Sequence, residues 1–307
     1  MRIIISVLPK IYYTPNMGEK IRNIFKMSGV FRCHHPTHKQ FDYAVSPYHL
    51  FRVTRCWPEG CVEFLWRCHQ FDKGHKCPKK YKHVGRGCSS CKYYYEIKNC
   101  NAPETVFDDS QLTEFIRKLR EYEGWLESMN GKTVRFSGII DSIRPRLTLK
   151  IGRSGRHLRM EDYFLSFSTG YFGTDLFDDR LYLKITGGFL KRNELAIDDE
   201  IECDVIFTVE KGRIILRNPR RVDHTKNGGI QTLTTSNALV GRATGKVITG
   251  SISFCDDCQY CCLIDIEDDS RAKPAFYRRF YCLRGIDDPE YCPVRLERLN
   301  PDNITGN

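Results

Sequence analysis

Alternation of apolar and polar positions is strongest in the middle of the chain, between Lys132 and Val222. In the run 201–209, isoleucine, cysteine, valine and phenylalanine stand at every second position, with mostly acidic or hydroxyl-bearing side chains between them. A period of two is typical of β-strands that bury one face. Similar runs lie at 134–143, 163–167, 181–185 and 213–216. The pattern therefore predicts five strands within about ninety residues.

One long amphipathic helix is predicted just before these strands, at residues 109–130. Apolar side chains recur there at the helical spacing of three or four residues, and the opposite face mixes acidic and basic residues. Asp109 or Ser110 can cap the start, and Asn130-Gly131 can end the helix. We interpret this helix as a structural element with no binding role, because a mixed-charge face is typical of an ordinary solvent-exposed surface.

The order and spacing of the predicted strands resemble the OB family of five-stranded Greek-key barrels. Asp198-Asp199 before the fourth strand and Lys211-Gly212 between the fourth and fifth are similar to that family. The resemblance covers under a third of the chain. It implies a mainly β, α+β protein in which the helix leads into an OB-like barrel. It also implies a single-stranded nucleic acid as ligand, because these barrels stack bases on aromatic rings beside a cationic groove.

Fifteen cysteines fall mainly into two groups on either side of the predicted barrel. Eight lie between Cys33 and Cys100 and six between Cys255 and Cys292, whereas Cys203 stands alone in an apolar strand and is interpreted as a core residue. No apolar run has the length of a signal peptide or a membrane span, so we expect a cytoplasmic protein. In that reducing compartment, clustered cysteines are more often metal ligands than disulfides.

The sharpest metal-binding signal is Cys88-Ser-Ser-Cys91, because a spacing of two residues lets both sulfurs bind one ion. A tetrahedral site needs two further ligands. Cys68 and Cys77 are the first choice for them, and Cys100 is the substitute. Buried cysteines that bind no metal are the alternative interpretation.

A second set of possible ligands lies in the same region. Cys33, Cys56 and Cys61 could form another site with His35 or His38. The spacings of this set match no familiar metal-binding pattern, so cysteines without a metal are at least as good an interpretation here.

The C-terminal cysteines also offer four ligands. Cys255 and Cys258 form a close pair, and Cys282 and Cys292 follow, so these four are the first choice for a second metal site. Cys261 is a further candidate, because cysteines at every third position from Cys255 are the opening of a bacterial ferredoxin motif. We expect Zn²⁺ at about two structural sites, with a 4Fe-4S cluster as the alternative, because thiolates suit both.

A net charge of +10 makes a polyanionic partner plausible. Nine basic and histidine residues fall within the stretch 73–92, beside several tyrosines. Cations that neutralise phosphates and rings that stack on bases together favour a nucleic-acid surface. The candidate contacts come from this stretch, from the predicted barrel and from a Gly-flanked loop: Lys79, Lys80, Lys82, Arg86, Arg144, Arg146, Tyr171 and Phe172. A solvated basic face is an equally good explanation of the charge run.

No catalytic motif is present, because the chain has neither a Walker-type phosphate loop nor a His-Glu-x-x-His helix. We therefore expect a non-catalytic protein that binds single-stranded DNA or RNA and contains structural metals. The alternatives are an iron–sulfur redox or electron-transfer protein and a zinc-stabilised scaffold for protein interactions. The predicted segments are an unassigned start at 1–30, a Cys/His-rich metal module at 31–108, the helix and barrel at 109–223, a linker at 224–245 and a four-cysteine metal module at 246–307.

Overall fold

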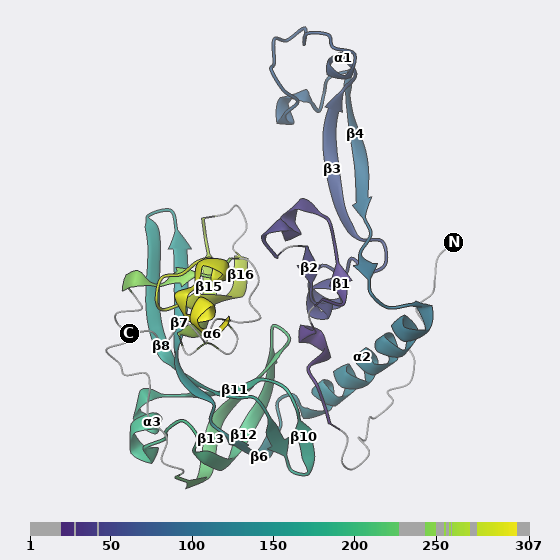
Figure 1. The fold of residues 1–307 in the computed structure, drawn as a ribbon. Helices are drawn as coiled ribbons and strands as arrows, with labels where there is room; N and C mark the ends of the chain where they lie inside the picture. The colour runs from purple at the N-terminus through teal and green to yellow at the C-terminus, as the bar shows by residue number, and fades with distance from the viewer. Residues whose placement is uncertain are drawn as a thin grey trace. The chain divides into compact units, whose positions relative to one another are not determined.

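In a computed structural model of the chain, the structure describes residues 20–27, 29–41, 43–226, 243–249, 255, 258, 260–270 and 275–299. These residues form a mainly β protein with few helices, which confirms the predicted α+β class (Figure 1). They divide into two compact units. Residues 27–108 make the hairpin unit, and the described residues 20–26 and those from 109 onward make the sheet unit.

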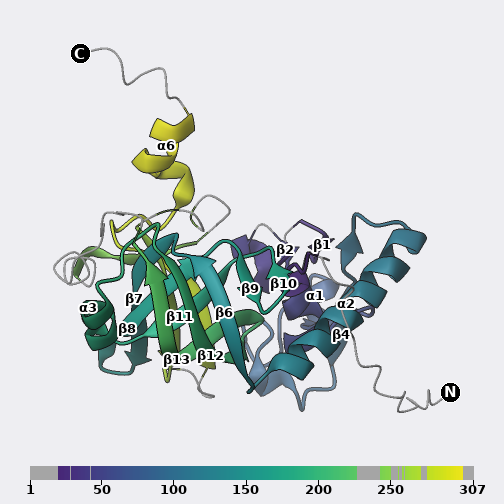
Figure 2. The same ribbon diagram turned by 90° about the horizontal axis from the view of Figure 1, so that it is seen from below.

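The sheet unit is built on eleven strands in the order β10-β9-β6-β12-β13-β11-β8-β7-β15-β16-β14. Neighbouring strands are antiparallel except for two parallel pairs, β11 with β13 and β7 with β15. Figure 2 shows β6, β12, β13, β11, β8 and β7 as one continuous layer. The strands are β6 (Thr133–Ile139), β7 (Ser142–Gly152), β8 (Gly155–Phe167), β9 (Gly170–Phe172), β10 (Asp175–Phe177), β11 (Leu181–Ile185), β12 (Glu200–Glu210), β13 (Arg213–Thr225), β14 (Lys246–Val247), β15 (Cys261–Asp268) and β16 (Ala275–Cys282).

β6 and β7 are nearly one strand, because only two residues separate them. The first, Ile140, donates its N–H to the carbonyl of Asp199 beside β12 (2.9 Å), and the second, Asp141, donates to the carbonyl of Ser166 in β8 (2.9 Å). The chain therefore changes its pairing partner at this point. The predicted strands are present in β6–β7, β8, β11, β12 and β13. The predicted five-stranded barrel is not confirmed as a unit of its own, because these strands belong to the larger sheet.

The helix predicted at 109–130 is α2 (Asp109–Met129), and its apolar side is buried. Trp125 lies in the middle of that side. Its ring stacks on the ring of Phe177 in β10 with 6.0 Å between centroids, and it meets the ring of Phe207 in β12 edge-on at 5.5 Å. The apolar positions that define the helix in the sequence therefore also fix it against the sheet.

The other helical elements of the sheet unit are short. They are η1 (Ile24–Lys26), α3 (Gly187–Asn193), η5 (Pro289–Tyr291) and α6 (Pro293–Leu299). Figure 2 shows α3 at the opposite edge of the sheet from α2. Among the helices that the structure describes, none combines the length and the apolar character needed to cross a bilayer.

The Lys211-Gly212 turn predicted between the fourth and fifth strands is present between β12 and β13. Both residues have positive φ (50° and 76°), which a two-residue hairpin turn requires. β13 then continues to Thr225 and so enters the segment predicted as a linker at 224–245. Most of that segment, residues 227–242, lies outside the described residues.

The expectation that Tyr171 and Phe172 lie in a loop is wrong. Both belong to β9, which pairs with β6 and β10. Phe172 is buried against the rings of Phe136 and Phe207 (5.6 and 5.1 Å between centroids). Gly170 permits this packing, because a Cβ at that position would lie 2.5 Å from the Phe136 ring. A strand of three residues is too short to show a period of two in the sequence.

The hairpin unit takes its name from β3 (Cys61–Cys68) and β4 (Tyr94–Asn101), which form a sheet of two strands. Figure 1 shows α1 (His69–Asp72) at the far end of the hairpin, which is its tip. η4 (Arg86–Cys88) belongs to the same connection between the strands. At the other end of the hairpin unit lies a three-stranded sheet in the order β2-β1-β5.

A small aromatic core forms around that three-stranded sheet. Phe31 is fully buried, and its ring contacts those of Phe51, Trp57 and Phe107 at 5.4 to 6.2 Å between centroids. The short elements around it are β1 (Phe31–Arg32), η2 (Pro36–Phe41), β2 (Ala44–Val45), η3 (His49–Val53) and β5 (Glu104–Thr105). Because these elements are short and share one small core, bound metal would add to the stability of this unit.

Candidate metal centres and a candidate nucleic-acid surface

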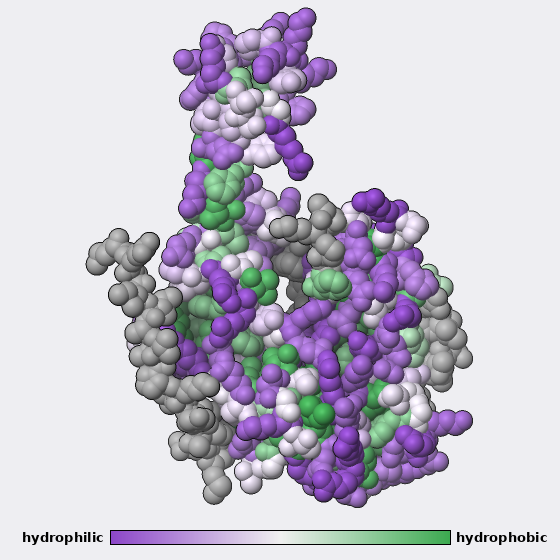
Figure 3. Space-filling model, turned by 180° about the vertical axis from the view of Figure 1, so that it is seen from behind, coloured by the Kyte–Doolittle hydropathy of each residue, from purple (hydrophilic) through white to green (hydrophobic). Residues whose placement is uncertain are grey.

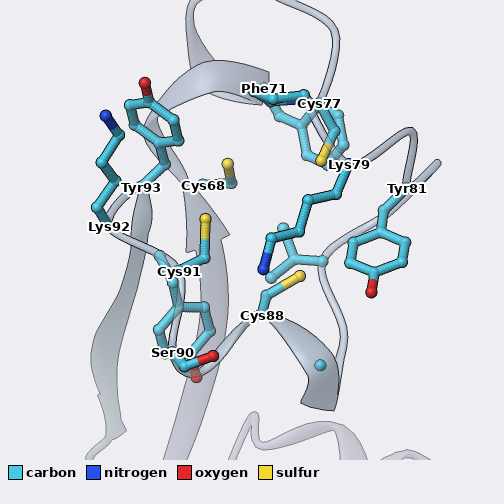
Figure 4. A pocket seen from close by; sticks show the side chains of 14 residues that line it. Cys68, Phe71, Cys77, Lys79, Tyr81, Cys88, Ser90, Cys91, Lys92 and Tyr93 are labelled. Carbon is cyan, nitrogen blue, oxygen red and sulfur yellow. The ribbon is translucent and has the colours of Figure 1, made fainter.

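The tip of the hairpin contains a cavity of about 400 Å³ that is lined by Cys68, Cys77, Cys88 and Cys91. Cys68 is the last residue of β3. Cys88 and Cys91 belong to a tight turn in which the Cys91 N–H donates to the Cys88 carbonyl (2.8 Å). Figure 4 shows sulfur atoms around the cavity on different sides of it. The four first-choice ligands of the N-terminal module therefore lie around one space.

The four sulfur atoms of this group do not lie as close together as one ion requires. Among the described residues, no three of these donors lie within 4.8 Å of one another. Two thiolates on one Zn²⁺ would be about 3.8 Å apart, given a Zn–S bond of about 2.3 Å. The loops would therefore have to contract around a single ion. Cys100, the substitute ligand, lies six residues beyond Tyr94 on β4, about 20 Å away along an extended strand, so it lies outside this group.

A second group of metal-binding side chains lies near the start of β3. The Sγ atoms of Cys33 and Cys61 and a ring nitrogen of His38 all lie within 4.8 Å of one another, so this Cys-Cys-His group could bind a metal ion. Cys33 follows β1, and His38 lies in η2. Of the two histidines left open by the sequence, His38 is therefore the one beside the thiols, whereas His35 hydrogen-bonds Thr37 (2.8 Å).

Burial determines the protonation of this second group. Burial, followed by the neighbouring thiols of Cys56 and Cys33, raises the pKa of Cys61 to about 12. Burial also lowers the pKa of His38, and burial together with His38 lowers the pKa of His49 to about 4. At neutral pH Cys61 is therefore a neutral thiol and His49 a neutral imidazole. A bound divalent cation would reverse this for the thiols, because coordination favours the thiolate.

The four C-terminal cysteines chosen from the sequence also lie in one region, and all are buried. Cys258, Cys282 and Cys292 line a cavity of about 160 Å³. Burial, followed by the thiols of these three, raises the pKa of the fourth, Cys255, to about 11. Cys261 donates its N–H to the Cys258 carbonyl (3.0 Å), while its side chain lies in a hydrophobic cluster. A metal bound here would sit among side chains that are already packed.

The predicted nucleic-acid contacts have different environments in the two units. Four of them are exposed on the hairpin unit: Lys79, Lys80, Lys82 and Arg86. In the sheet unit, Arg144 is only 6% exposed, and Arg146 forms an ion pair with Asp265 (3.6 Å). Phe172 is a core residue, whereas Tyr171 is 47% exposed. Of the four candidates in the sheet unit, Tyr171 therefore offers the most accessible side chain.

One face of β8, β11 and β13 is covered by the C-terminal strands. Phe164, Tyr182 and Ile215, one from each of these strands, are buried in a single hydrophobic cluster with Leu263 of β15 and Phe280 of β16. The rings of Phe164 and Tyr182 meet edge-on inside it, with 5.7 Å between centroids. These rings are therefore core residues and are not available for stacking on a base.

One exposed surface was not predicted from the sequence. Val62, Phe64 and Trp66 stand two residues apart on β3, so they share one face, and they are 41%, 57% and 42% exposed. Lys98 of β4 lies directly opposite Phe64. Figure 3 shows hydrophobic side chains along the hairpin and hydrophilic ones at its tip. The alternation of large apolar residues in β3 is the signal that could have revealed this surface.

Comparison with models of known protein families, with curated proteins and with solved structures finds no match for this chain. Its function is therefore inferred from the residues and their geometry.

Proposed function

We propose that the protein binds single-stranded nucleic acid on the hairpin unit, catalyses no reaction, and uses metal ions at its cysteine groups to hold its structure. The observation that carries the proposal is the combination of exposed rings on β3 with unneutralised cations at the tip. Cations attract the phosphates of a strand, and rings stack on its bases. The two features together fit a single strand better than either does alone.

Within the described residues, the cations at the tip have no acidic ion-pair partners. All nine basic and histidine side chains between residues 73 and 92 are exposed, and none of them forms an ion pair within the described part of the chain. Asp72, the acidic residue next to them in the sequence, accepts a hydrogen bond from the hydroxyl of Tyr95 (2.7 Å). Unpaired surface cations can exchange the counterions of a polyanion for direct contacts, which makes binding salt-dependent.

Phe64 and Trp66 supply the stacking platform in this proposal. Side chains two residues apart on one strand are about 7 Å apart, so an extended strand of nucleic acid can place one base on each ring. Lys98, opposite Phe64, is positioned to contact the phosphate backbone. Stacking on an aromatic ring contributes about 1–3 kcal/mol per base and tolerates any sequence. The surface therefore favours binding with little sequence preference.

The sheet unit acts as a support in this proposal, and we infer that it contains a barrel of the OB type. A bent first strand, β6–β7, pairs with β12 through its first part and with β8 through its second. β11 pairs in parallel with β13, and α3 lies between β11 and β12 in the sequence. These pairings support a five-stranded Greek-key barrel in which β8 and β11 are the second and third strands.

The covered face of that barrel favours the hairpin as the contact surface. OB barrels bind oligonucleotides on the face of their second and third strands. Here the rings on that face, Phe164 and Tyr182, are buried by the C-terminal strands. An incoming strand would have to displace those strands to reach the barrel, whereas the rings of β3 are already exposed.

Removal of the tip cations tests the electrostatic part of the proposal. The tip variant carries three substitutions: Lys79→Ala, Lys80→Ala and Lys82→Ala. Fluorescence anisotropy with a labelled single-stranded oligonucleotide is measured at several salt concentrations. Each lysine that no longer neutralises a phosphate should reduce the slope of log affinity against log salt by about 0.7, so we expect a slope shallower by about 2.

A control variant removes the same charge from exposed positions of the sheet unit: Lys132→Ala, Lys191→Ala and Arg192→Ala. We expect the control to keep the wild-type slope. Equal slopes for the wild type and the tip variant would contradict the proposal. The absence of salt-sensitive binding at micromolar concentrations of the wild-type protein would also contradict it.

A second candidate function is electron transfer or redox sensing through an iron–sulfur cluster at the tip. The observation that favours it is that four thiols line a cavity of about 400 Å³ and no three of them lie within 4.8 Å of one another, because a cluster is larger than a single ion. Protein purified without oxygen would then contain iron and sulfide and absorb broadly in the visible range. A colourless protein that contains zinc would reject this candidate.

A further inference from the structure

Cys33, His38, Cys56 and Cys61 form a largely buried group in the hairpin unit, in which only Cys61 is partly exposed, and none of them lines the cavity at the tip. Cys33 is completely buried, and His38 and Cys56 are 4% and 6% exposed. The donor atoms of Cys33, His38 and Cys61 already lie within 4.8 Å of one another. Ligands of one tetrahedral zinc stand about 3.3–3.8 Å apart, so a shift of about 1 Å would complete the geometry.

Cys56 is the natural fourth member of the group. The thiols of both Cys56 and Cys33 lie close enough to Cys61 to raise its pKa, so each of the two is a neighbour of the Cys61 sulfur. We propose that Cys33, His38, Cys56 and Cys61 bind one Zn²⁺ with three thiolates and one imidazole. This site is additional to the four-cysteine groups at the tip and in the C-terminal segment. It does not depend on whether the protein binds nucleic acid.

The state of the His38 ring identifies the coordinating atom. Its Nδ1 is buried and has no hydrogen-bond partner. Its Nε2 lies 2.9 Å from Nε2 of His49, at hydrogen-bond distance. Metal-binding histidines commonly donate their second N–H to a neighbouring acceptor, which fixes the tautomer and leaves the other nitrogen for the metal. In this arrangement Nε2–H of His38 donates to His49, and Nδ1 binds the ion.

The ligands are held in place by the surrounding backbone and one hydroxyl. Thr54 donates its hydroxyl hydrogen to Cys56 Sγ (3.0 Å), an interaction that would stabilise a thiolate. The backbone N–H of Gly60 donates to the carbonyl of Cys56, and closes the loop before Cys61. Gly60 has φ of 91°, and a Cβ there would lie 2.0 Å from the carbonyl oxygen of Asn101. The tight turn between the two cysteines therefore requires glycine.

The ligand set decides the metal and the role of the site. Three sulfurs and one imidazole nitrogen suit tetrahedral Zn²⁺. Four protein ligands leave no open position for water or substrate, so the site is structural. Binding of the ion releases three protons from the thiols to the solvent. The ion joins β1, η2 and the start of β3, which are far apart in the sequence.

Zinc content of the full chain tests the proposal. The wild type, His38→Gln and the control His35→Gln are purified with zinc in the medium, and bound zinc per chain is measured by mass spectrometry. We expect His38→Gln to hold one zinc fewer than the wild type. His35→Gln should match the wild type, because the His35 ring lies outside the group. Equal zinc content in the wild type and His38→Gln overturns the proposal.

A second variant separates loss of a ligand from loss of folding. His38→Cys replaces the imidazole by a fourth thiolate, so we expect it to keep the wild-type amount of metal. With Co²⁺ in place of Zn²⁺, its thiolate-to-metal absorption should be stronger than that of the wild type, because the coordination changes from three sulfurs to four. Loss of one metal equivalent from His38→Cys, or an unchanged Co²⁺ spectrum, contradicts the assignment of His38 as a ligand.

Discussion

The two cysteine-rich regions of this protein use similar residues in opposite ways. Each has a close cysteine pair, further cysteines, arginines or lysines, and several aromatic rings. In the hairpin unit the tip cations and the rings of Phe64 and Trp66 are exposed. In the C-terminal region the cysteines are buried, and Arg278, with a side chain only 7% exposed, is bonded to Asp265 and Glu210.

The number of neighbouring strands explains the difference. β15 lies between β7 and β16 and is buried on both faces, so its side chains join the core of the sheet unit. β3 pairs only with β4, and both faces of that pair remain largely open. A two-stranded sheet has too little apolar area to be stable alone. We therefore propose that the hairpin depends on bound metal for its structure, while its exposed side chains are free for contacts.

Metal removal should separate the two regions most strongly. Structural zinc contributes about 10–16 kcal/mol to the folding of small zinc-finger peptides, and the hairpin has little other tertiary stabilisation. After treatment with a zinc chelator, we expect the segment 61–101 to lose protection in hydrogen exchange measured by mass spectrometry. The segment 200–225, in the centre of the large sheet, should stay protected and serves as the internal control. A hairpin that stays protected without metal would contradict this dependence.

Replacement of Arg278 should produce the next largest effect. Its guanidinium donates to Asp265 (2.9 Å) on β15 and to Glu210 (3.1 Å) on β12. Arg278→Met keeps much of the volume but leaves two partly buried carboxylates without their shared cation. Asp265 keeps Lys211 and Arg146, and Glu210 keeps Arg217, so we expect the free energy of unfolding, measured in urea, to fall by about 1–3 kcal/mol.

The exposed substitution Arg192→Met on α3 provides the control for this change, and we expect an effect within about 0.5 kcal/mol. A loss below about 1 kcal/mol for Arg278→Met would show that the ion pairs do not fasten the C-terminal strands to the sheet.

Acid should weaken the sheet unit through the same ion pairs. Burial alone would raise the pKa of Asp265, but its hydrogen bonds with Arg278 and the charges of Arg278, Lys211 and Arg146 outweigh burial and hold the pKa below its usual value. The pKa of Glu210 is also lowered against the effect of burial, first by its hydrogen bond with Arg217 and then by the charge of Arg278. A carboxyl with a depressed pKa stabilises the folded state above its unfolded value, and this contribution is lost as pH falls through the folded value.

Urea denaturation as a function of pH measures this effect. We expect the free energy of unfolding to decrease as pH falls below about 4, the usual carboxyl value. In Arg278→Met this decrease should be smaller, because Asp265 loses the partner that does most to lower its pKa, whereas Glu210 keeps its hydrogen bond with Arg217. An identical pH dependence in both proteins would assign the acid sensitivity to other groups.

Local pattern was sufficient to predict the long elements and two of the cysteine groups. Helix α2 and the strands of the sheet follow from a period of 3.6 or 2 that extends over many residues. The groups that contain Cys88 and Cys91, and Cys255 and Cys258, follow from the short spacing of each pair, because such a pair is already close in space. The partners chosen for them line the same two cavities, Cys68 and Cys77 at the tip and Cys282 and Cys292 in the C-terminal region, and metal binding by these groups stays a prediction.

Features that depend on long-range pairing could not be predicted. Ile264 of β15 pairs with Leu147 of β7, more than a hundred positions earlier, and nothing in the local pattern indicates that partnership. It is this pairing that buries Arg144 and covers Phe164. The group around Cys33 and Cys61 was named from the sequence only as a possible site, with His35 and His38 both open, because its members meet only after the small sheet and η2 have formed.

The exposure of the rings on β3 also depends on the tertiary fold, because the rings stay exposed only if no other element covers that face of the strand. The period of two in that segment predicts an apolar face, but only the fold shows that no further strand or helix among the described residues covers it. Val62, Phe64 and Trp66 would otherwise be interpreted as core residues.

The most direct test of the central claim is the affinity of the hairpin rings for a single strand. Phe64→Ala with Trp66→Ala is compared with Tyr171→Ala, which removes a similarly exposed ring from the sheet unit. Anisotropy titration with a single-stranded oligonucleotide at fixed low salt gives the Kd of each protein. At about 1–3 kcal/mol per stacked base, we expect the double variant to raise Kd by at least about tenfold and Tyr171→Ala to leave it unchanged. A double variant that binds as tightly as the wild type, or a Tyr171→Ala variant that loses as much affinity, would contradict the placement of the binding surface on β3.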